Sequence, residues 1–198
     1  MARLIHLGRV PYAVAWDLQK RVLDEVIAGG ENTVILCEHE PVYTVGRKRG
    51  AMGNVLVAGD TPVVEVERGG DVTWHGPGQL VVYPILRLEN ADLHAHLRRL
   101  EQVVIDTCAA LGVVAGRDDR NTGVWHGGRK FCSIGIACRR WVTWHGLAIN
   151  VDVDLGVYAG INPCGFDASV MTTLSEAAGR RLTVSEVEGR LAEAMQAW

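Results

Sequence analysis

Residues 131–151 read FCSIGIACRRWVTWHGLAINV, two runs of β-branched and aromatic residues separated by a short basic connection. Such runs predict strands at residues 131–137 and 141–151, and the connection at residues 138–140 is short enough for a hairpin. Because the second strand follows the first without an intervening helix, this stretch predicts antiparallel pairing and argues against a regular strand–helix–strand repeat.

Five more short runs of the same composition predict strands in the rest of the chain. They lie at residues 33–37, 42–45, 63–66, 80–86 and 122–125. Residues 68–79, between two of these runs, hold four glycines and a proline and are expected to form a loop that lets backbone approach a ligand closely.

Three amphipathic segments predict helices. The first opens at Pro11, repeats an apolar residue every four positions at Val14, Leu18, Val22 and Val26, and ends at a pair of glycines. The second carries an apolar stripe over residues 93–111, and the third follows the capping-box sequence TVSE at residues 183–186. Helices and strands together predict an α+β (α/β) fold, with a mixed, largely antiparallel sheet packed by helices.

Length and composition limit the classes of protein that remain. The 198 residues suit one domain over residues 1–198, and 48% hydrophobic with 22% charged residues is typical of a globular protein. A net charge of −3 gives no basic surface for nucleic acid, and no apolar stretch approaches the roughly 20 residues of a membrane span. Since five cysteines also suit a reducing compartment, we expect a cytoplasmic protein with no nucleic-acid or membrane partner.

One cysteine stands apart from the other four. Cys164 lies in residues 162–166, NPCGF, a loop bracketed by proline and glycine without apolar periodicity. A cysteine in a strand or helix usually acts as a small buried hydrophobe, which we expect of the remaining four. These are Cys37, Cys108, Cys132 and Cys138. Cys164 is therefore the thiol presented to a substrate, unless it is incidental to a tight turn.

Lys130, at the start of the strand at residues 131–137, has two possible roles beside such a thiol. Its ammonium would lower the pKa of the cysteine, and its neutral amine would accept the thiol proton. To act as a base, the amine needs its pKa lowered from about 10.4 toward 7, on the order of 4 to 5 kcal/mol, which burial would supply. Gly135 and Gly146, inside the two strands, indicate either a bulge or close approach of the backbone to a ligand.

The histidines do not predict a metal site. His94 and His96 are two residues apart on a helix, which turns their rings roughly 200° apart, so they cannot share an ion. The Cys-x-His pair at residues 37–39 has no second pair at zinc-site spacing. His75 and His145 each precede a glycine where a pocket is expected, and structural and catalytic roles both remain open for them.

Four motifs follow one another along the chain. They are RGGDVTWHGPGQL at residues 68–80, GRKFCSIGI at 128–136, TWHGLAINVD at 143–152 and INPCGF at 161–166. In this order and at these separations they closely resemble the lipoyl(octanoyl) transferases, octanoyl-acyl carrier protein:protein N-octanoyltransferases. The resemblance covers residues 30–175 and implies that residues 1–198 form an octanoyltransferase catalytic domain of the biotin/lipoate protein ligase type.

The resemblance also implies roles for individual residues. Cys164 matches the family's acyl-thioester nucleophile, and Lys130 matches the lysine that activates it. Three segments match the stretches that bind the acyl chain and thioester. Their residues are Arg68, Gly69, Gly70, Asp71, Val72, Thr73, Trp74, His75, Ser133, Ile134, Gly135, Gly146, Leu147 and Ala148.

The implied reaction moves octanoyl from acyl carrier protein to Cys164 and then to a lysine of a lipoyl domain. Acceptors would be the lipoyl domains of 2-oxoacid dehydrogenases and the glycine-cleavage H protein, in the first step of endogenous protein lipoylation. Because a thioester is already activated, no ATP, metal or other cofactor is expected. The basic turn at residues 47–49 is expected to be a solvated loop. As a hypothesis, acidic partners are steered by Arg47, Lys48, Arg49, Arg139 and Arg140.

Other functions remain as alternatives. The nearest is an ATP-dependent lipoate or biotin protein ligase of the same fold. A Cys-His amidase or peptidase would pair Cys164 with His75 or His145. A metal- or lipid-binding module without catalysis is the third.

Overall fold

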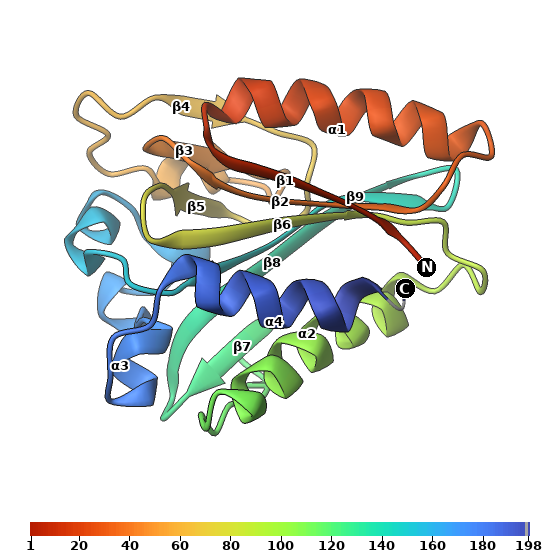
Figure 1. Cartoon of the computed structure of the whole chain (residues 1–198). Coiled ribbons are helices and arrows are strands. Elements are labelled where there is room, and N and C mark those ends of the chain that lie inside the picture. Colours follow the sequence, from red (N-terminus) through yellow and green to blue (C-terminus); the bar gives the residue numbers. More distant parts are fainter. Residues whose placement is uncertain (197) are drawn as a thin grey trace.

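The computed structural model describes residues 1–196 and 198. Its helices are α1 (Tyr12–Ile27), α2 (Leu93–Ala110), α3 (Leu174–Ala178) and α4 (Val184–Gln196), with short 3₁₀ turns η1 (Ala51–Asn54), η2 (Leu155–Gly160), η3 (Pro163–Gly165) and η4 (Ala168–Val170). Its strands are β1 (Arg3–Val10), β2 (Thr33–His39), β3 (Val42–Val45), β4 (Val63–Glu65), β5 (Val72–His75), β6 (Gln79–Ile85), β7 (Gly123–His126), β8 (Arg129–Arg139) and β9 (Val142–Asn150) (Figure 1).

A six-stranded sheet forms the central layer, in the order β1-β2-β6-β9-β8-β7. β1 and β2 are parallel and are joined by α1, whereas every other pair of neighbours in this sheet is antiparallel. A second sheet, β4-β3-β5, contains one parallel and one antiparallel pair. The predicted α+β fold with a mixed, largely antiparallel sheet is confirmed.

The hairpin predicted from residues 131–151 is the β8–β9 pair. Its register runs without a break from Cys132 opposite Ile149 to Arg139 opposite Val142. The connection is two residues, Arg140 and Trp141, one fewer than expected, and both have positive φ (52° and 60°). Two positive φ angles give the turn that matches the right-handed twist of the paired strands, so β8 and β9 extend to the tip.

Helices cover both faces of the large sheet. α1 lies above the sheet in Figure 1, and α2 and α4 lie side by side below it. Alternate residues of β2 point to opposite faces of the sheet. Val34 and Leu36 pack in the core between the sheet and helices α2 and α4, and Ile35 packs in the core between the sheet and α1. Every residue of β9 is buried, because both faces of the sheet are covered along this strand.

The small sheet has its own core and holds the Cys164 turn in place. Tyr43, Trp74 and Tyr158 pack together there with residues of η2 and η4. The η3 turn, which contains Cys164, lies against β5 and η1.

Two strands were not predicted from the sequence. β1 is an edge strand, only partly buried, and its register shifts at Gly8, which has a φ of 63°; this weakens the alternation that marks a strand. β5 lies inside residues 68–79, where glycines and a proline on either side suggested an uninterrupted loop. These residues form a strand because they pair with β3, which the local composition does not indicate.

The predicted helices are present, with one correction to the first. Val14 of α1 is 52% exposed, so it does not belong to the buried face, which instead includes Ala15, Val22 and Val26. Across residues 1–196, no helix combines the length and the apolar character needed to cross a bilayer.

Candidate active site

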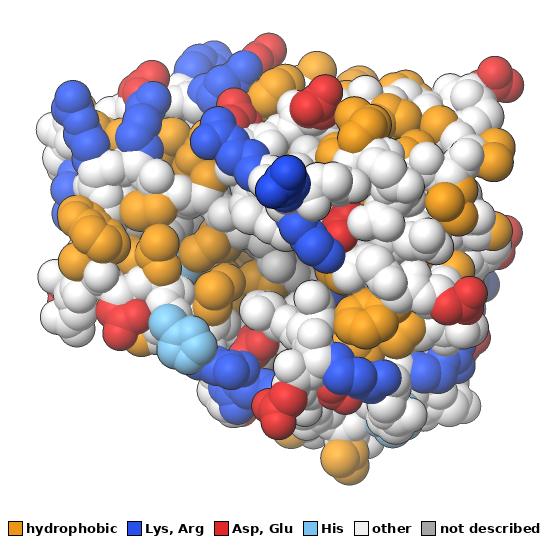
Figure 2. Space-filling model, turned by 180° about the vertical axis from the view of Figure 1, so that it is seen from behind, with side chains coloured by type: hydrophobic (Ala, Val, Ile, Leu, Met, Phe, Trp, Pro, Cys, Tyr) orange, Lys and Arg blue, Asp and Glu red, His pale blue; other side chains and the backbone are white. Residues whose placement is uncertain are grey.

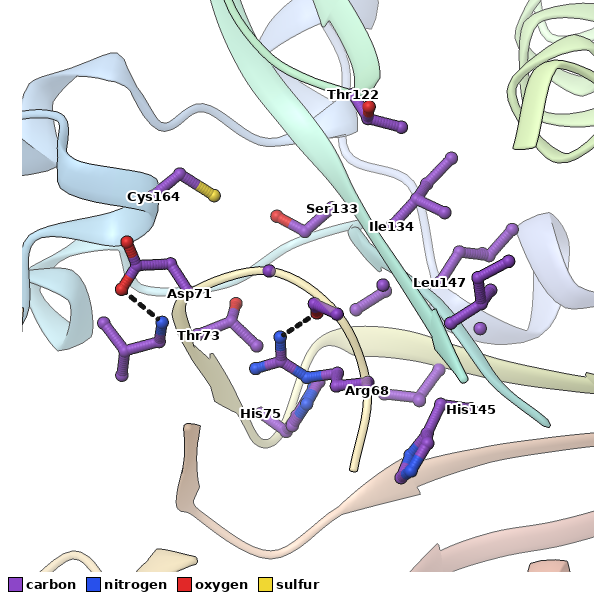
Figure 3. A pocket seen from close by; sticks show the side chains of 18 of the residues that line it. Arg68, Asp71, Thr73, His75, Thr122, Ser133, Ile134, His145, Leu147 and Cys164 are labelled. Carbon is purple, nitrogen blue, oxygen red and sulfur yellow. Dashed lines mark hydrogen bonds between the residues drawn. The ribbon is translucent and has the colours of Figure 1, made fainter. Parts of the chain in front are cut away.

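A cavity of about 300 Å³ lies between the segment that leads into β5, the middle of β8 and β9, and the Cys164 turn (Figure 3). It brings together Cys164, Lys130 and every predicted substrate-binding residue except Trp74. The predicted residues that line it are Arg68, Gly69, Gly70, Asp71, Val72, Thr73, His75, Ser133, Ile134, Gly135, Gly146, Leu147 and Ala148. Motifs up to 96 residues apart in sequence, from Arg68 to Cys164, therefore share one space.

Trp74 is the exception because strand neighbours point to opposite faces. Its ring packs against Tyr158 in the core of the small sheet, with centroids 6.2 Å apart, while Thr73 and His75 on either side of it line the cavity. Trp74, named from the sequence among the substrate-binding residues, therefore does not line the cavity.

The cavity also has walls that the motifs did not indicate. α1 contributes Tyr12 and α2 contributes Leu97, while Asn121 and Thr122 come from the segment before β7. Each lies outside the four motifs, and no local pattern distinguishes it from an ordinary helix or loop residue. Their place depends on how the helices pack on the sheet.

Cys164 is presented by a tight turn with unusual backbone geometry. Its φ of 58° and ψ of 18° are left-handed, and Gly165 follows with a φ of 82°. A left-handed conformation at a residue other than glycine costs free energy and is held here by the turn and by the buried Pro163. The thiol is half-buried, and Figure 3 shows its sulfur directed into the cavity, across from Ser133.

Lys130 is the ionisable partner of this thiol. Its side chain is 2% exposed, and its Nζ lies 4.0 Å from Cys164 Sγ. Nζ also donates to the carbonyl oxygen of Thr122 at 2.7 Å and to Oδ1 of Asn121. Burial lowers the pKa of Lys130, and the negative charge of a Cys164 thiolate works in the opposite direction.

These three partners suit both protonation states of the pair. Two hydrogens on Nζ are directed to Asn121 and Thr122 in either state. The third position faces Sγ, either as an N–H toward a thiolate or as a lone pair toward an S–H. Moving one proton between sulfur and nitrogen therefore needs no rearrangement of the other bonds.

Because Gly123 has no side chain, the Lys130 side chain has room to pack against it. A Cβ at Gly123 would stand 2.5 Å from Lys130 Cε and 2.3 Å from the carbonyl oxygen of Cys132, and the φ of 142° at Gly123 is itself in the glycine region. The β7–β8 register shifts beside this point, between Val124 and Trp125. A glycine and a bulge thus let a long basic side chain lie under the sheet edge.

Arg68 places a fixed positive charge on the opposite wall. Its guanidinium donates to the carbonyl oxygen and hydroxyl of Thr44 (2.8 and 2.9 Å) and to the carbonyl oxygen of Gly69 (3.1 Å). Burial lowers the pKa of Arg68, but arginine stays protonated in proteins. Gly135 lies beside this side chain, and a Cβ there would be 2.9 Å from the Gly69 carbonyl oxygen, so this position has no room for a side chain. The predicted approach of the Gly135 backbone to a ligand stays a prediction.

Neither histidine of the cavity is paired with the thiol. His75 uses Nδ1 with Gln79 Oε1 (2.7 Å) and Nε2 with Thr44 Oγ1 (3.2 Å). His145 directs Nε2 toward Glu67, 3.4 Å away. Burial lowers the pKa of both, to about 3 for His145, so both rings are neutral near pH 7.

Lys48 is a cavity residue that the motifs did not include. It is half-exposed, as expected of a solvated basic turn, and it also lines the cavity, where its Nζ donates to Asp71 Oδ2 at 2.8 Å. Asn54 donates to both oxygens of the same carboxylate, at 2.8 and 2.9 Å. Within the described part of the chain, no group of three or more His, Cys, Asp or Glu residues is arranged to hold a metal ion.

The sequence matches a known family over nearly its whole length. The model of the lipoyl protein ligase A/B catalytic domain matches residues 11–196. A protein named octanoyltransferase from Geobacter sulfurreducens is 50% identical over 193 residues, 96% of this chain and 81% of that protein. Another octanoyltransferase, from Mycobacterium tuberculosis, is 46% identical and covers 96% of this chain and 83% of its own length.

Solved structures agree on the fold at much lower identity. A crystal structure of lipoate-protein ligase A bound with ATP superposes with a TM-score of 0.80 at 15% identity, over 99% of this chain and 84% of that one. A biotin protein ligase from Aquifex aeolicus gives a TM-score of 0.56 at 15% identity, over 100% of this chain and 69% of the ligase. These similarities confirm the predicted fold class.

Proposed function

This chain belongs to the lipoyl protein ligase A/B catalytic domain family, and from that premise we propose that it is an octanoyltransferase acting through a thioester on Cys164. The observation that carries the proposal is the buried Lys130 amine, 4.0 Å from the Cys164 sulfur at the wall of a cavity large enough for an acyl chain. The carrier of the incoming octanoyl group in this proposal is acyl carrier protein.

In the first half-reaction, the Cys164 sulfur attacks the carbonyl carbon of the octanoyl thioester. Its electron pair forms the new S–C bond, the bond to the carrier's pantetheine sulfur breaks, and that thiolate leaves with a proton from the Lys130 ammonium. Octanoate stays on the enzyme as a thioester. Lys130 holds the proton at Nζ because Asn121 and Thr122 fix the amine beside the reacting sulfur.

In the second half-reaction, the neutral amine of an acceptor lysine attacks the same carbonyl carbon. A C–N bond forms, the Cys164 thiolate is expelled, and the proton lost by the amine passes to Lys130 or the thiolate. The acceptors we propose are lipoyl domains, including those of 2-oxoacid dehydrogenases, and the glycine-cleavage H protein. Residues 1–198 would act as one catalytic domain in the cytoplasm.

Apolar burial gives the cavity its selectivity. Leu97, Ile134, Leu147 and Ala148 offer aliphatic surface along its length. About seven apolar carbons of an octanoyl tail contribute on the order of 5 kcal/mol at about 0.8 kcal/mol per CH₂. Each missing pair of carbons therefore weakens binding by about tenfold.

The alternatives receive less support. Relatives at 44% to 50% identity are named octanoyltransferase, whereas the ATP-bound ligase shares the fold at 15% identity. A Cys-His amidase needs a histidine beside the nucleophile, but both ring nitrogens of His75 are engaged by Gln79 and Thr44. Nε2 of His145 is directed toward Glu67, 3.4 Å away.

The test is intact-protein mass spectrometry after mixing the enzyme with octanoyl-acyl carrier protein, without ATP. We expect an octanoyl adduct on the wild type that thiols remove, that is absent from Cys164→Ser, and that disappears when a lipoyl domain is added. Lys130→Ala should form the same adduct at least 10²-fold more slowly. Modification of the lipoyl domain that requires ATP and free octanoate would contradict the proposal.

A further inference from the structure

The turn that carries Cys164 uses the backbone donors that follow the nucleophile. Gly165 donates its N–H to the carbonyl oxygen of Asn162, and Phe166 donates its own to Pro163, both at 3.0 Å. In many acyl-transfer sites the N–H after the nucleophile binds the oxyanion of the tetrahedral intermediate. Here the N–H groups of both residues that follow Cys164 are engaged within the turn, so neither is free to bind an oxyanion.

Lys48 reaches the cavity beside this turn. Its Nζ lies 3.8 Å from the position that a Cβ on Gly165 would occupy, which puts the ammonium next to the residue after the nucleophile. Lys48 and Cys164 line the same cavity. A Cys164 thiolate helps to raise the pKa of Lys48, after the larger effect of the hydrogen bond to Asp71.

Asp71 fixes the position of this ammonium. Its side chain is 1% exposed, and its oxygens accept from Lys48 Nζ, from Asn54 and from the Val72 N–H at 2.8 to 2.9 Å. Burial raises the pKa of Asp71, but these hydrogen bonds outweigh burial and hold it below its usual value, so the carboxylate is ionised. The bond to Asp71 uses one N–H of Lys48, and no other described residue accepts from Nζ.

We propose that Lys48, held by Asp71, is a further catalytic residue that donates a hydrogen bond to the oxyanion formed when Cys164 attacks the octanoyl thioester. The idea rests on the proposed function. As the S–C bond forms, the carbonyl π pair moves onto oxygen, and it returns when the bond to the pantetheine sulfur breaks. Lys48 gives up no proton, and it meets the same oxyanion again when the acceptor amine attacks.

The experiment separates oxyanion stabilisation from thiolate formation and from partner docking. Acylation of Cys164 by octanoyl-pantetheine, a thioester without a carrier protein, is followed by rapid quench and mass spectrometry. Alkylation by iodoacetamide reports the thiolate, because that reaction forms no oxyanion. The variants are Lys48→Met, Lys48→Arg and the double variant Lys48→Met/Asp71→Asn, which leaves no buried unpaired carboxylate.

Lys20→Met is the matched control. Lys20 is also half-exposed and paired with an aspartate (Asp17, 2.7 Å), but it lies on α1 away from the Cys164 cavity. We expect Lys48→Met and the double variant to acylate about 10²-fold more slowly, with alkylation changed by less than about threefold. Lys48→Arg should recover most of the rate, and Lys20→Met should match the wild type.

Two results would overturn the assignment. If Lys48→Met acylates from octanoyl-pantetheine at the wild-type rate, Lys48 has no part in the chemistry. If alkylation falls by the same factor as acylation, Lys48 acts on the thiolate and not on the oxyanion. An absence of adduct on the wild type would contradict the proposed function itself, which distinguishes that failure from a defect confined to the variants.

Discussion

Asn121 has no chemistry of its own in the proposed reaction, yet its side chain helps to orient the Lys130 amine. Asn121→Ala removes one of the two oxygen acceptors of Nζ, and the amine is then free to turn away from Cys164. We expect iodoacetamide alkylation of Cys164 at pH 7 to slow by about tenfold, equivalent to about 1.4 kcal/mol.

Asn32→Ala is the control for this prediction, since the side chain of Asn32 accepts from the Arg87 N–H and does not line the cavity. Equal alkylation rates in Asn121→Ala and the wild type across pH 6 to 9 would show that Thr122 alone positions the amine. A slower rate in both asparagine variants would indicate a general loss of structure.

A second prediction at this scale concerns His96, which is buried with an unpaired Nε2. Burial, assisted by the charge of Arg99, lowers the pKa of His96 to about 4. Between pH 6.5 and 4 the unfolded chain therefore binds more protons than the folded one, so the stability present above pH 6.5 is lost as pH falls. From pH 7 to 4.5 this amounts to about 2 to 3 kcal/mol.

Urea unfolding at those two pH values tests the prediction. His96→Leu should lose about 2 to 3 kcal/mol less on acidification than the wild type, because it removes the titrating group. His94→Leu, exposed on the same helix, should behave as the wild type does. Equal acid sensitivity of His96→Leu and the wild type would mean that His96 titrates normally.

At the scale of elements, Gly135 of β8 and Gly146 of β9 face each other in the sheet but contact different parts of the protein. A Cβ on Gly146 would stand 2.2 Å from the carbonyl oxygen of Val82 in β6, so Gly146→Ala should strain the sheet and destabilise the fold by about 3 kcal/mol. A Cβ on Gly135 would meet Gly69 and Arg68 at 2.9 and 3.1 Å. Gly135→Ala should therefore fold but displace this cavity wall and slow acylation by about tenfold.

Gly189 supplies the contrast for both variants. It lies in the middle of α4 with nothing near its Cβ position, so Gly189→Ala should stabilise the protein by about 1 kcal/mol. Thermal unfolding measures the stability of all three glycine variants, and single-turnover acylation measures their rate of thioester formation. Normal stability of Gly146→Ala would show that β6 and β9 can separate without cost.

The elements also show where prediction from the sequence succeeds. The β8–β9 hairpin and the helices α1, α2 and α4 were predictable because their patterns continue over eight or more residues. The five-residue helix α3 was not predicted, because it is too short to show a helical period. β5 was not, because its four residues become a strand only through pairing with β3. The same limit applies to the site: motifs located Cys164, Lys130 and most of the cavity wall, whereas Lys48, Asn121 and Leu97 are defined only by tertiary packing.

At the scale of the whole molecule, the five basic residues expected to steer partners are not equivalent. Lys48 is paired with Asp71, and Arg139 is paired with Asp24. Arg47, Arg49 and Arg140 are exposed and have no acidic partner among the described residues. Figure 2, which shows the face turned away in Figure 1, has Lys and Arg side chains gathered beside a hollow in the surface.

Reversing these three charges should slow the encounter with an acidic carrier. For Arg47→Glu/Arg49→Glu/Arg140→Glu, we expect kcat/KM with octanoyl-acyl carrier protein to fall about tenfold at low salt, with the difference shrinking in 0.5 M NaCl. Octanoyl-pantetheine should react normally. Arg190→Glu, an exposed change on α4, is the control. An equal loss in the control, or a loss that salt does not alter, would remove the steering hypothesis.

The five cysteines have very different surroundings. Cys37, Cys108 and Cys132 are buried, which raises the pKa of each thiol, to about 12 for Cys108, and partial burial also raises that of Cys138. Among the five, only Cys164 lines the cavity, and the Lys130 amine lies beside it. A limiting dose of a mild electrophile near neutral pH should therefore label one sulfur per chain, and the label stoichiometry would report the fraction of competent enzyme in any preparation without substrate and without replacing the other thiols.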